Sequence, residues 1–174
     1  TILVDCEGQP IFDITAKGEI TDYFESPTGC YTSGDATQAY EGELSKFVRQ
    51  IVYLRPDVFL VIDDLAAGEP SSFTWACHAL SEMDLQPDDR RITITEGDAH
   101  LDIAFAAPEG ISMKQDNDWD GHPPQGRFED RPRNWHTFVE TESDANNQRF
   151  VTLMKVRKGG QQPAFEAHEN AAAN

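Results

Sequence analysis

A histidine inside a strand-like stretch is the first residue that could do chemistry. Residue types alternate in 73–79, so the aromatic side chains fall on one face of a strand and His78 falls on the other, beside small neighbours. Zinc prefers an imidazole together with a carboxylate, and Asp22 or Asp35 on preceding strands could supply the oxygen ligand. The alternative is a histidine that is simply hydrogen-bonded within the sheet.

A carboxylate and a phenol five residues apart are the second candidate. The segment 34–40 places Asp35 and Tyr40 at the end of a strand. Tyrosine can act as a general base or acid when a cation or metal lowers its pKa, which makes Tyr40 the candidate catalytic residue. The alternative is that Gly-Asp-Ala-Thr forms a turn and that Tyr40 only packs.

The segment 116–121 carries three aspartates at the spacing of a calcium-binding loop. Arg127 stands where such a loop has its glutamate, and no helices are expected on either side. A calcium site and a solvated acidic loop therefore remain alternatives.

The one basic and aromatic cluster of the chain lies at 131–136. Arg133 could bind an anionic sugar by its charge, and Trp135 could stack against the ring. Charge balance at a sheet edge would explain the same cluster.

Several common motifs are absent. The sequence has no GxSxG elbow, Walker loop, GxGxxG or HExxH, so hydrolase, nucleotide-binding and metalloprotease functions lose their main support. The three cysteines are widely spaced and form no CxxC pair, which argues against a disulfide framework or a zinc knuckle.

Short strand-like segments must position these residues. Ten candidate strands alternate with Gly, Pro, Asp and Ser clusters, and no long helical period occurs. Residues 47–63 predict a hairpin of apolar strands that lies in the middle of a layered sheet. Residues 108–132 predict a long loop, and 159–174 a polar tail that frays. Residues 1–158 are therefore predicted to form an all-β, antiparallel, two-layer sandwich with few or no helices.

Composition limits the partners of such a domain. The 174 residues include 14 Lys and Arg against 31 Asp and Glu, a formal net charge of −17. This charge repels phosphate backbones and anionic lipids, which argues against nucleic acid or a membrane surface as a partner. No apolar run approaches the roughly 20 residues that cross a bilayer. The first five residues are typical of the middle of a strand, so we expect the chain to be a piece of a longer protein.

In order and spacing, five segments resemble the C-terminal β-sheet domain of heparinase II/III-like polysaccharide lyases. The segments are residues 1–9, 18–20, 34–40, 49 with 54–63, and 75–78. The resemblance covers about residues 1–80. Such lyases pair an N-terminal helical toroid with an antiparallel super-sandwich and cleave uronic-acid polysaccharides by β-elimination.

The resemblance also implies site residues and a metal. Family members usually carry a His-Asn pair directly before the strand that begins here at Thr1. They hold a metal, commonly zinc, through His, Asp and His. His78 resembles the downstream ligand, Asp22 or Asp35 the carboxylate, and the upstream His would precede Thr1. Tyr40 is the matching candidate for a tyrosine that reaches the cleft.

From the resemblance, this chain is expected to be a lyase domain that lacks the full catalytic set by itself. Its partner would be an anionic polysaccharide in a cleft shared with the toroid, and the toroid would supply the cations. The protein would be periplasmic or secreted. The alternative is a non-catalytic carbohydrate-binding or structural β-sandwich module, with Trp119 and Trp135 as stacking platforms.

Overall fold

The computed structural model describes residues 1–10, 15–40, 42–118, 133–161 and 165. Twelve strands and two short 3-10 helices form this described part, and no helix in it is long and apolar enough to cross a membrane. In chain order the elements are β1 (Ile2–Val4), β2 (Glu19–Ser26), β3 (Gly29–Asp35), η1 (Thr37–Tyr40), β4 (Leu44–Leu54), β5 (Val58–Ser71), β6 (Phe73–Ala79), β7 (Asp84–Gln86), η2 (Pro87–Asp89), β8 (Arg91–Glu96), β9 (Ala99–Ala107), β10 (Ile111–Asp116), β11 (Trp135–Thr141) and β12 (Ala145–Lys158).

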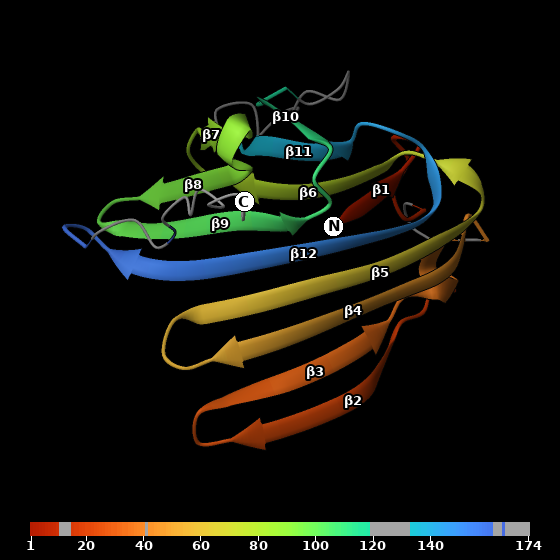
Figure 1. Ribbon diagram of the computed structural model, residues 1–174, viewed down its shortest axis with the longest axis horizontal. Helices are drawn as coiled ribbons and strands as arrows, with labels where there is room; N and C mark the ends of the chain where they lie inside the picture. The colour runs from red at the N-terminus through yellow and green to blue at the C-terminus, as the bar shows by residue number, and fades with distance from the viewer. Residues whose placement is uncertain (11–14, 41, 119–132, 162–164, 166–174) are drawn as a thin grey trace, which may run out of the picture.

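The strands form two antiparallel sheets. Four strands pair in the order β1-β6-β11-β10, and eight pair in the order β2-β3-β4-β5-β12-β9-β8-β7. In Figure 1, β12 and β5 cross the centre of the molecule, and the smaller sheet lies in the upper part of the view, so β2 and β3 extend beyond it. The predicted all-β, antiparallel sandwich with few or no helices is confirmed.

Aromatic and branched side chains fill the space between the sheets. Phe73 of β6, in the smaller sheet, and Phe150 of β12, in the larger sheet, are fully buried. Trp75 of the smaller sheet meets Phe105 of the larger one edge to face, with 5.2 Å between ring centroids. Such aromatic contacts bury large apolar areas, so this cluster holds the two layers together.

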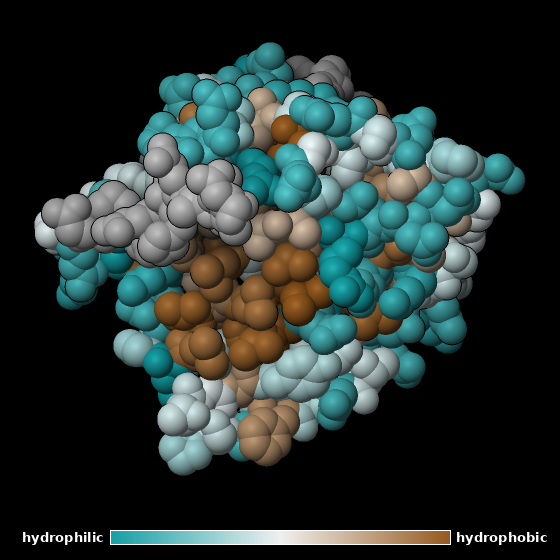
Figure 2. Space-filling model, in the orientation of Figure 1, coloured by the Kyte–Doolittle hydropathy of each residue, from teal (hydrophilic) through white to brown (hydrophobic). Residues whose placement is uncertain are grey.

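The apolar hairpin predicted around residue 56 is the pair β4 and β5. Its register places Leu54 opposite Val58 and continues to Phe47 opposite Leu65, so the pair is central in the larger sheet as expected. On the face away from the core, Leu60 is half-buried, and hydrophobic surface gathers over these strands and β12 in Figure 2. Both faces of the hairpin are therefore apolar.

The prediction of one long loop over residues 108–132 is wrong for its first part. Residues 111–116 form β10, which pairs along its full length with β11. Ile111 is buried and Met113 packs against the core, but Ser112 between them and the charged Lys114 and Asp116 hide this alternation in the sequence. Residues 119–132 lie outside the described part of the chain.

Candidate functional site

A cavity of about 450 Å³ lies beside the strand that starts at Ile2, over the inner face of β3 and β4. Its lining combines one cation, one phenol and two carboxylates with small and apolar residues: Thr1, Gln9, Gly18, Glu19, Ile20, Thr32, Gly34, Asp35, Ala36, Tyr40, Phe47, Arg49 and Ile51. A second cavity, of about 590 Å³, shares Gly18, Glu19 and Asp35 with the first and adds Lys17. The two together form a candidate binding site for an elongated ligand.

Arg49 is the cation of the first cavity, and a buried carboxylate holds it in place. Its Nε and Nη2 donate to Asp63 at 2.5 and 2.9 Å. The Asp63 side chain is fully buried, whereas that of Arg49 is 32% exposed. A bidentate pair fixes the plane of the guanidinium, so Arg49 presents an oriented cation to the cavity.

Neither Arg49 nor Asp63 was among the predicted site residues. In the β4–β5 hairpin the numbers of paired residues add to 112, as in Leu54 with Val58 and Arg49 with Asp63. The predicted turn at 55–57 has the same centre. The hairpin was thus a sequence signal that could have placed this arginine opposite this aspartate.

Tyr40, the predicted catalytic residue, lines the same cavity but is 1% exposed. Its hydroxyl donates to the carbonyl oxygen of Ile2 at 2.9 Å, and its ring meets Phe47 edge to face. Burial raises the pKa of Tyr40, which disfavours the phenolate. The packing role considered as the alternative describes this geometry, and a catalytic role stays a prediction.

Asp35 lies between the two cavities and is engaged in a turn. Its Oδ1 accepts the backbone N–H of Thr37 at 2.8 Å, at the start of η1. Hydrogen bonds from the side chain and then the backbone of Thr37 lower the pKa of Asp35, so it is ionised at neutral pH. The turn predicted here from Gly-Asp-Ala-Thr is therefore the local structure.

The three predicted zinc ligands are not brought together. Asp22 is exposed on β2, where its Oδ1 accepts the N–H of Tyr23 at 2.8 Å, and Asp35 lies on β3. His78 belongs to the other sheet. Within the described ranges no group of three or more His, Cys, Asp or Glu is placed to hold a metal ion. These residues do not fit a zinc site, so zinc stays a prediction and we derive no step through a metal.

His78 instead has a second imidazole as its neighbour. It lies on the face of β6 opposite the aromatic side chains, as expected, is exposed, and pairs across the strands with His136 of β11. The two Nδ1 atoms are 2.7 Å apart and the rings are nearly perpendicular, at 85°. Burial, followed by the neighbouring imidazole, lowers the pKa of His78. The hydrogen-bonded histidine considered as the alternative is the arrangement observed, although its partner is a side chain that the prediction did not include.

The predicted sugar-binding pair lies close by, at the start of β11. Trp135 is half-buried and packs against the core, while Arg133 pairs with Asp118 at 3.2 Å. Of the predicted calcium loop only residues 116–118 are described, and there Asp116 accepts the N–H of Asp118 at 3.3 Å. Trp119 lies outside the described residues.

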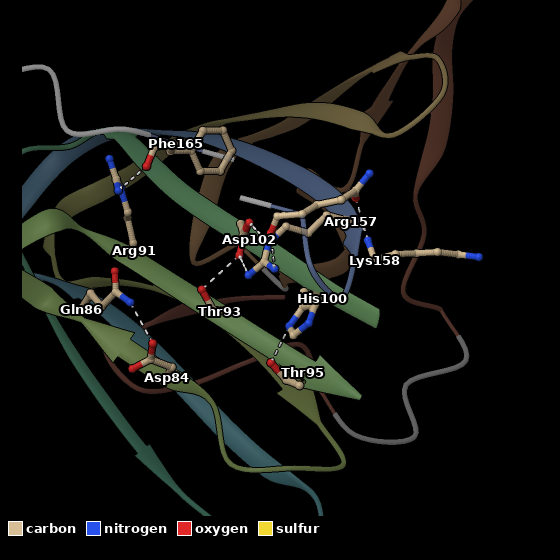
Figure 3. Close-up of polar contacts among 11 residues, drawn as sticks. Asp84, Gln86, Arg91, Thr93, Thr95, His100, Asp102, Arg157, Lys158 and Phe165 are labelled. Carbon is tan, nitrogen blue, oxygen red and sulfur yellow. Dashed lines mark hydrogen bonds and ion pairs between the residues drawn. The ribbon is translucent and has the colours of Figure 1, made fainter. Parts of the chain in front are cut away.

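A separate polar cluster lies on β8, β9 and β12 (Figure 3). Asp102 is 5% exposed, and it accepts from Nε of Arg157 at 2.6 Å and from the hydroxyl of Thr93 at 3.1 Å. Nearby, Arg91 donates to the carbonyl oxygen of Phe165 at 2.5 Å. The contacts join neighbouring strands and attach one residue of the predicted tail, so we assign this cluster a structural role.

Two antiparallel sheets, with two adjoining cavities beside β1, define this chain as a β-sandwich domain. Solved structures with a similar fold include heparinase III and a heparan sulfate lyase. A heparinase III gene product aligns with 91% of this chain at TM-score 0.72, and heparan sulfate lyase HepC from Pedobacter heparinus with 100% at TM-score 0.74, each at 15% sequence identity.

The likeness confirms, at the level of fold, the resemblance found in the sequence. The chain spans about a quarter of the length of these structures, 24% and 26%. A further heparinase III structure aligns with 91% of the chain at TM-score 0.68. No protein-family model and no curated protein matches the chain.

Proposed function

We propose that this chain is the β-sandwich domain of a heparinase II/III-like polysaccharide lyase and forms one wall of a cleft for a uronic-acid-containing glycan. The observation that carries the proposal is the cavity beside β1, in which Asp63 orients the guanidinium of Arg49. The shared fold of lyase structures supports it. The second wall would come from a helical toroid that precedes this domain, and the protein would act in the periplasm or outside the cell.

The reaction would be a β-elimination. A base removes the C5 proton next to the substrate carboxylate, the C4–O4 bond breaks as the C4–C5 double bond forms, and an acid protonates the departing oxygen. The step requires neutralisation of the carboxylate as charge builds up on it. Among the described residues that line the cavity, Arg49 is suited to that contact, and Tyr40 would act as base or acid only after giving up its bond to Ile2.

Strand register supports a contribution from residues before Thr1 in a longer protein. Ile2 pairs with Trp75 and Leu3 with Thr74, so each pair adds to 77. Continued backwards, the residue two before Thr1 would lie opposite His78. The His-Asn pair expected from the resemblance would thereby place a histidine beside the His78–His136 pair.

The test is turnover by the full-length protein. Heparan sulfate, alginate and related uronic polysaccharides should yield the ultraviolet absorbance of an unsaturated uronate. Arg49→Gln should lower kcat/KM by about 100-fold, because a charged hydrogen bond in a desolvated site contributes about 3 kcal/mol. Arg55→Gln, an exposed pair with Glu25, is the matched control and should retain activity. No product from any uronic polysaccharide would end the proposal.

The second candidate function is a non-catalytic carbohydrate-binding module. The engaged hydroxyl and raised pKa of Tyr40 favour it, because they leave no free phenol in the cavity. Affinity electrophoresis of the isolated chain separates the two functions. A binding module should be retarded by acidic glycans without any other domain, whereas one wall of a shared cleft should migrate freely.

A further inference from the structure

The His78–His136 pair can be assigned its hydrogen atoms from geometry. The residues are direct neighbours across β6 and β11, and their Nδ1 atoms lie 2.7 Å apart. Two bare nitrogen lone pairs would repel at this distance, so one Nδ1 carries a proton and the other accepts it. The contact is therefore an N–H···N hydrogen bond.

The opposite nitrogen of His136 decides which ring donates. Its Nε2 is buried and has no hydrogen-bond partner among the described residues. If Nδ1 of His136 accepted, Nε2 would carry the proton and become a buried donor without an acceptor. If Nδ1 donates, Nε2 is only an unpaired acceptor. Buried N–H groups without partners are rarer than under-satisfied acceptors, so His136 is the donor.

We infer that His136 is a positioning residue: it donates Nδ1–H to Nδ1 of His78 and thereby makes His78 present Nε2–H to a ligand instead of a lone pair to a metal ion. A neutral imidazole carries one N–H, and the accepting Nδ1 of His78 leaves the proton on Nε2. The dispersed positions of Asp22 and Asp35 agree with this assignment, because no group of three or more His, Cys, Asp or Glu within the described residues is placed to hold a metal ion around His78.

The ligand of His78 would be an anionic oxygen. An imidazole N–H donates to a carboxylate or sulfate, and acidic glycans carry both, so this part of the inference rests on the proposed function. His78 is exposed, whereas His136 is half-buried behind it. His136 thus acts through His78 and not on the ligand itself.

Nuclear magnetic resonance of the chain labelled with nitrogen-15 histidine tests the pair without any ligand. We expect a scalar coupling between the two Nδ1 nuclei, with the proton on Nδ1 of His136 and on Nε2 of His78. His78→Gln and His136→Gln assign the signals. His100→Gln is the control, since His100 contacts the hydroxyl of Thr95 on β8, in the other sheet, and should leave the coupling unchanged. A proton on Nε2 of His136, or no coupling, would overturn the inference.

Ligand titrations of the full-length protein, in which the whole proposed cleft is present, then test what His78 presents. A heparan sulfate oligosaccharide and inorganic sulfate, added separately, distinguish carboxylate from sulfate as the source of the oxygen. At least one should shift the Nε2–H signal of His78, and His136→Gln should weaken that binding severalfold while His100→Gln does not. Equimolar Zn²⁺ should leave the coupling intact, and its loss would restore the metal-ligand role. Absence of turnover by the full-length protein with the coupling present would reject the proposed lyase and leave the tautomer assignment standing.

Discussion

At the scale of single residues, the two partners of the Arg49–Asp63 ion pair differ in burial. The Asp63 side chain is fully buried, whereas the Arg49 side chain is partly exposed. Arg49→Gln leaves a fully buried carboxylate without its cation, and breaking such a pair costs about 3–5 kcal/mol. Urea unfolding of the variant should show this loss. Arg55→Gln removes an exposed pair with Glu25 and should cost under about 1 kcal/mol. Equal losses in the two variants would mean that Asp63 is solvated.

Removal of the Tyr40 hydroxyl distinguishes a packing role of this residue from a catalytic one. Tyr40→Phe keeps the ring against Phe47 and removes the hydroxyl that bonds to Ile2. We expect a loss of about 1 kcal/mol in the free energy of unfolding, the net value of one hydrogen bond. If Tyr40 also moves a proton, kcat of the full-length enzyme should fall by about 100-fold or more. A tenfold or smaller fall would assign the residue to packing.

At the scale of elements, Asp64 joins three neighbouring strands of the larger sheet. Lys46 of β4 lies 3.7 Å from Oδ2, and Arg149 of β12 donates to Oδ1 at 2.5 Å. The hydrogen bond from Arg149 is the main cause that lowers the pKa of Asp64 in the folded chain. The pair therefore stabilises the fold above the pKa of an unfolded aspartate, about 3.9, and its contribution disappears as pH falls through the lower folded value.

Asp64→Asn should consequently lose most at neutral pH and progressively less in acid. Urea titrations of the variant and of the unmodified chain measure the difference in unfolding free energy. They are made at pH 7 and below pH 4, on either side of the usual aspartate pKa of about 3.9. Asp88→Asn, in the exposed turn η2, is the control and should shift little. A difference that stayed constant with pH would contradict the charge-based role of Asp64.

Packing between the layers depends on one tryptophan more than on another. Trp75 is 5% exposed and contacts Phe105 across the two sheets, whereas Trp135 is half-buried at the start of β11. Trp75→Ala should cost about 3–5 kcal/mol through the cavity that it creates. Trp135→Ala, the matched change, should cost less than half as much by urea unfolding. The reverse order would mean that the described core is not the one that holds the sheets together.

At the scale of the whole molecule, the net charge of −17 opposes folding by self-repulsion. The described ion pairs are few compared with the excess of carboxylates. Raising the salt concentration from about 10 to 150 mM shortens the Debye length from about 30 to 8 Å, so Tm should rise. Calorimetry at constant pH measures the shift. A falling Tm would show that attractive pairs outweigh the repulsion.

The same charge disfavours an acidic glycan, so the proposed site depends on its local cations. Steering depends on the local field, and Arg49 and Lys17 share the two cavities with the carboxylates of Glu19 and Asp35. The remaining cations of the proposed cleft would come from the toroid.

The sequence by itself determined the architecture, because period-two alternation and turn residues are local signals. The hairpin around residue 56 and the outward direction of His78 follow from residue order alone. The strand over 111–116 was missed, because only two apolar residues mark it among polar ones. The family resemblance found in the sequence agreed with the fold likeness to lyase structures.

Only the tertiary structure decided which side chains meet. Asp22 and His78 are both on strands, but the chain assigns them to different sheets, and local pattern carries no information on that assignment. His136 follows a segment with weak strand signals, so its register against His78 became visible only once β6 and β11 were paired. Pairing partners distant in sequence are selected by the packing of the whole core, which is a property of all the strands together.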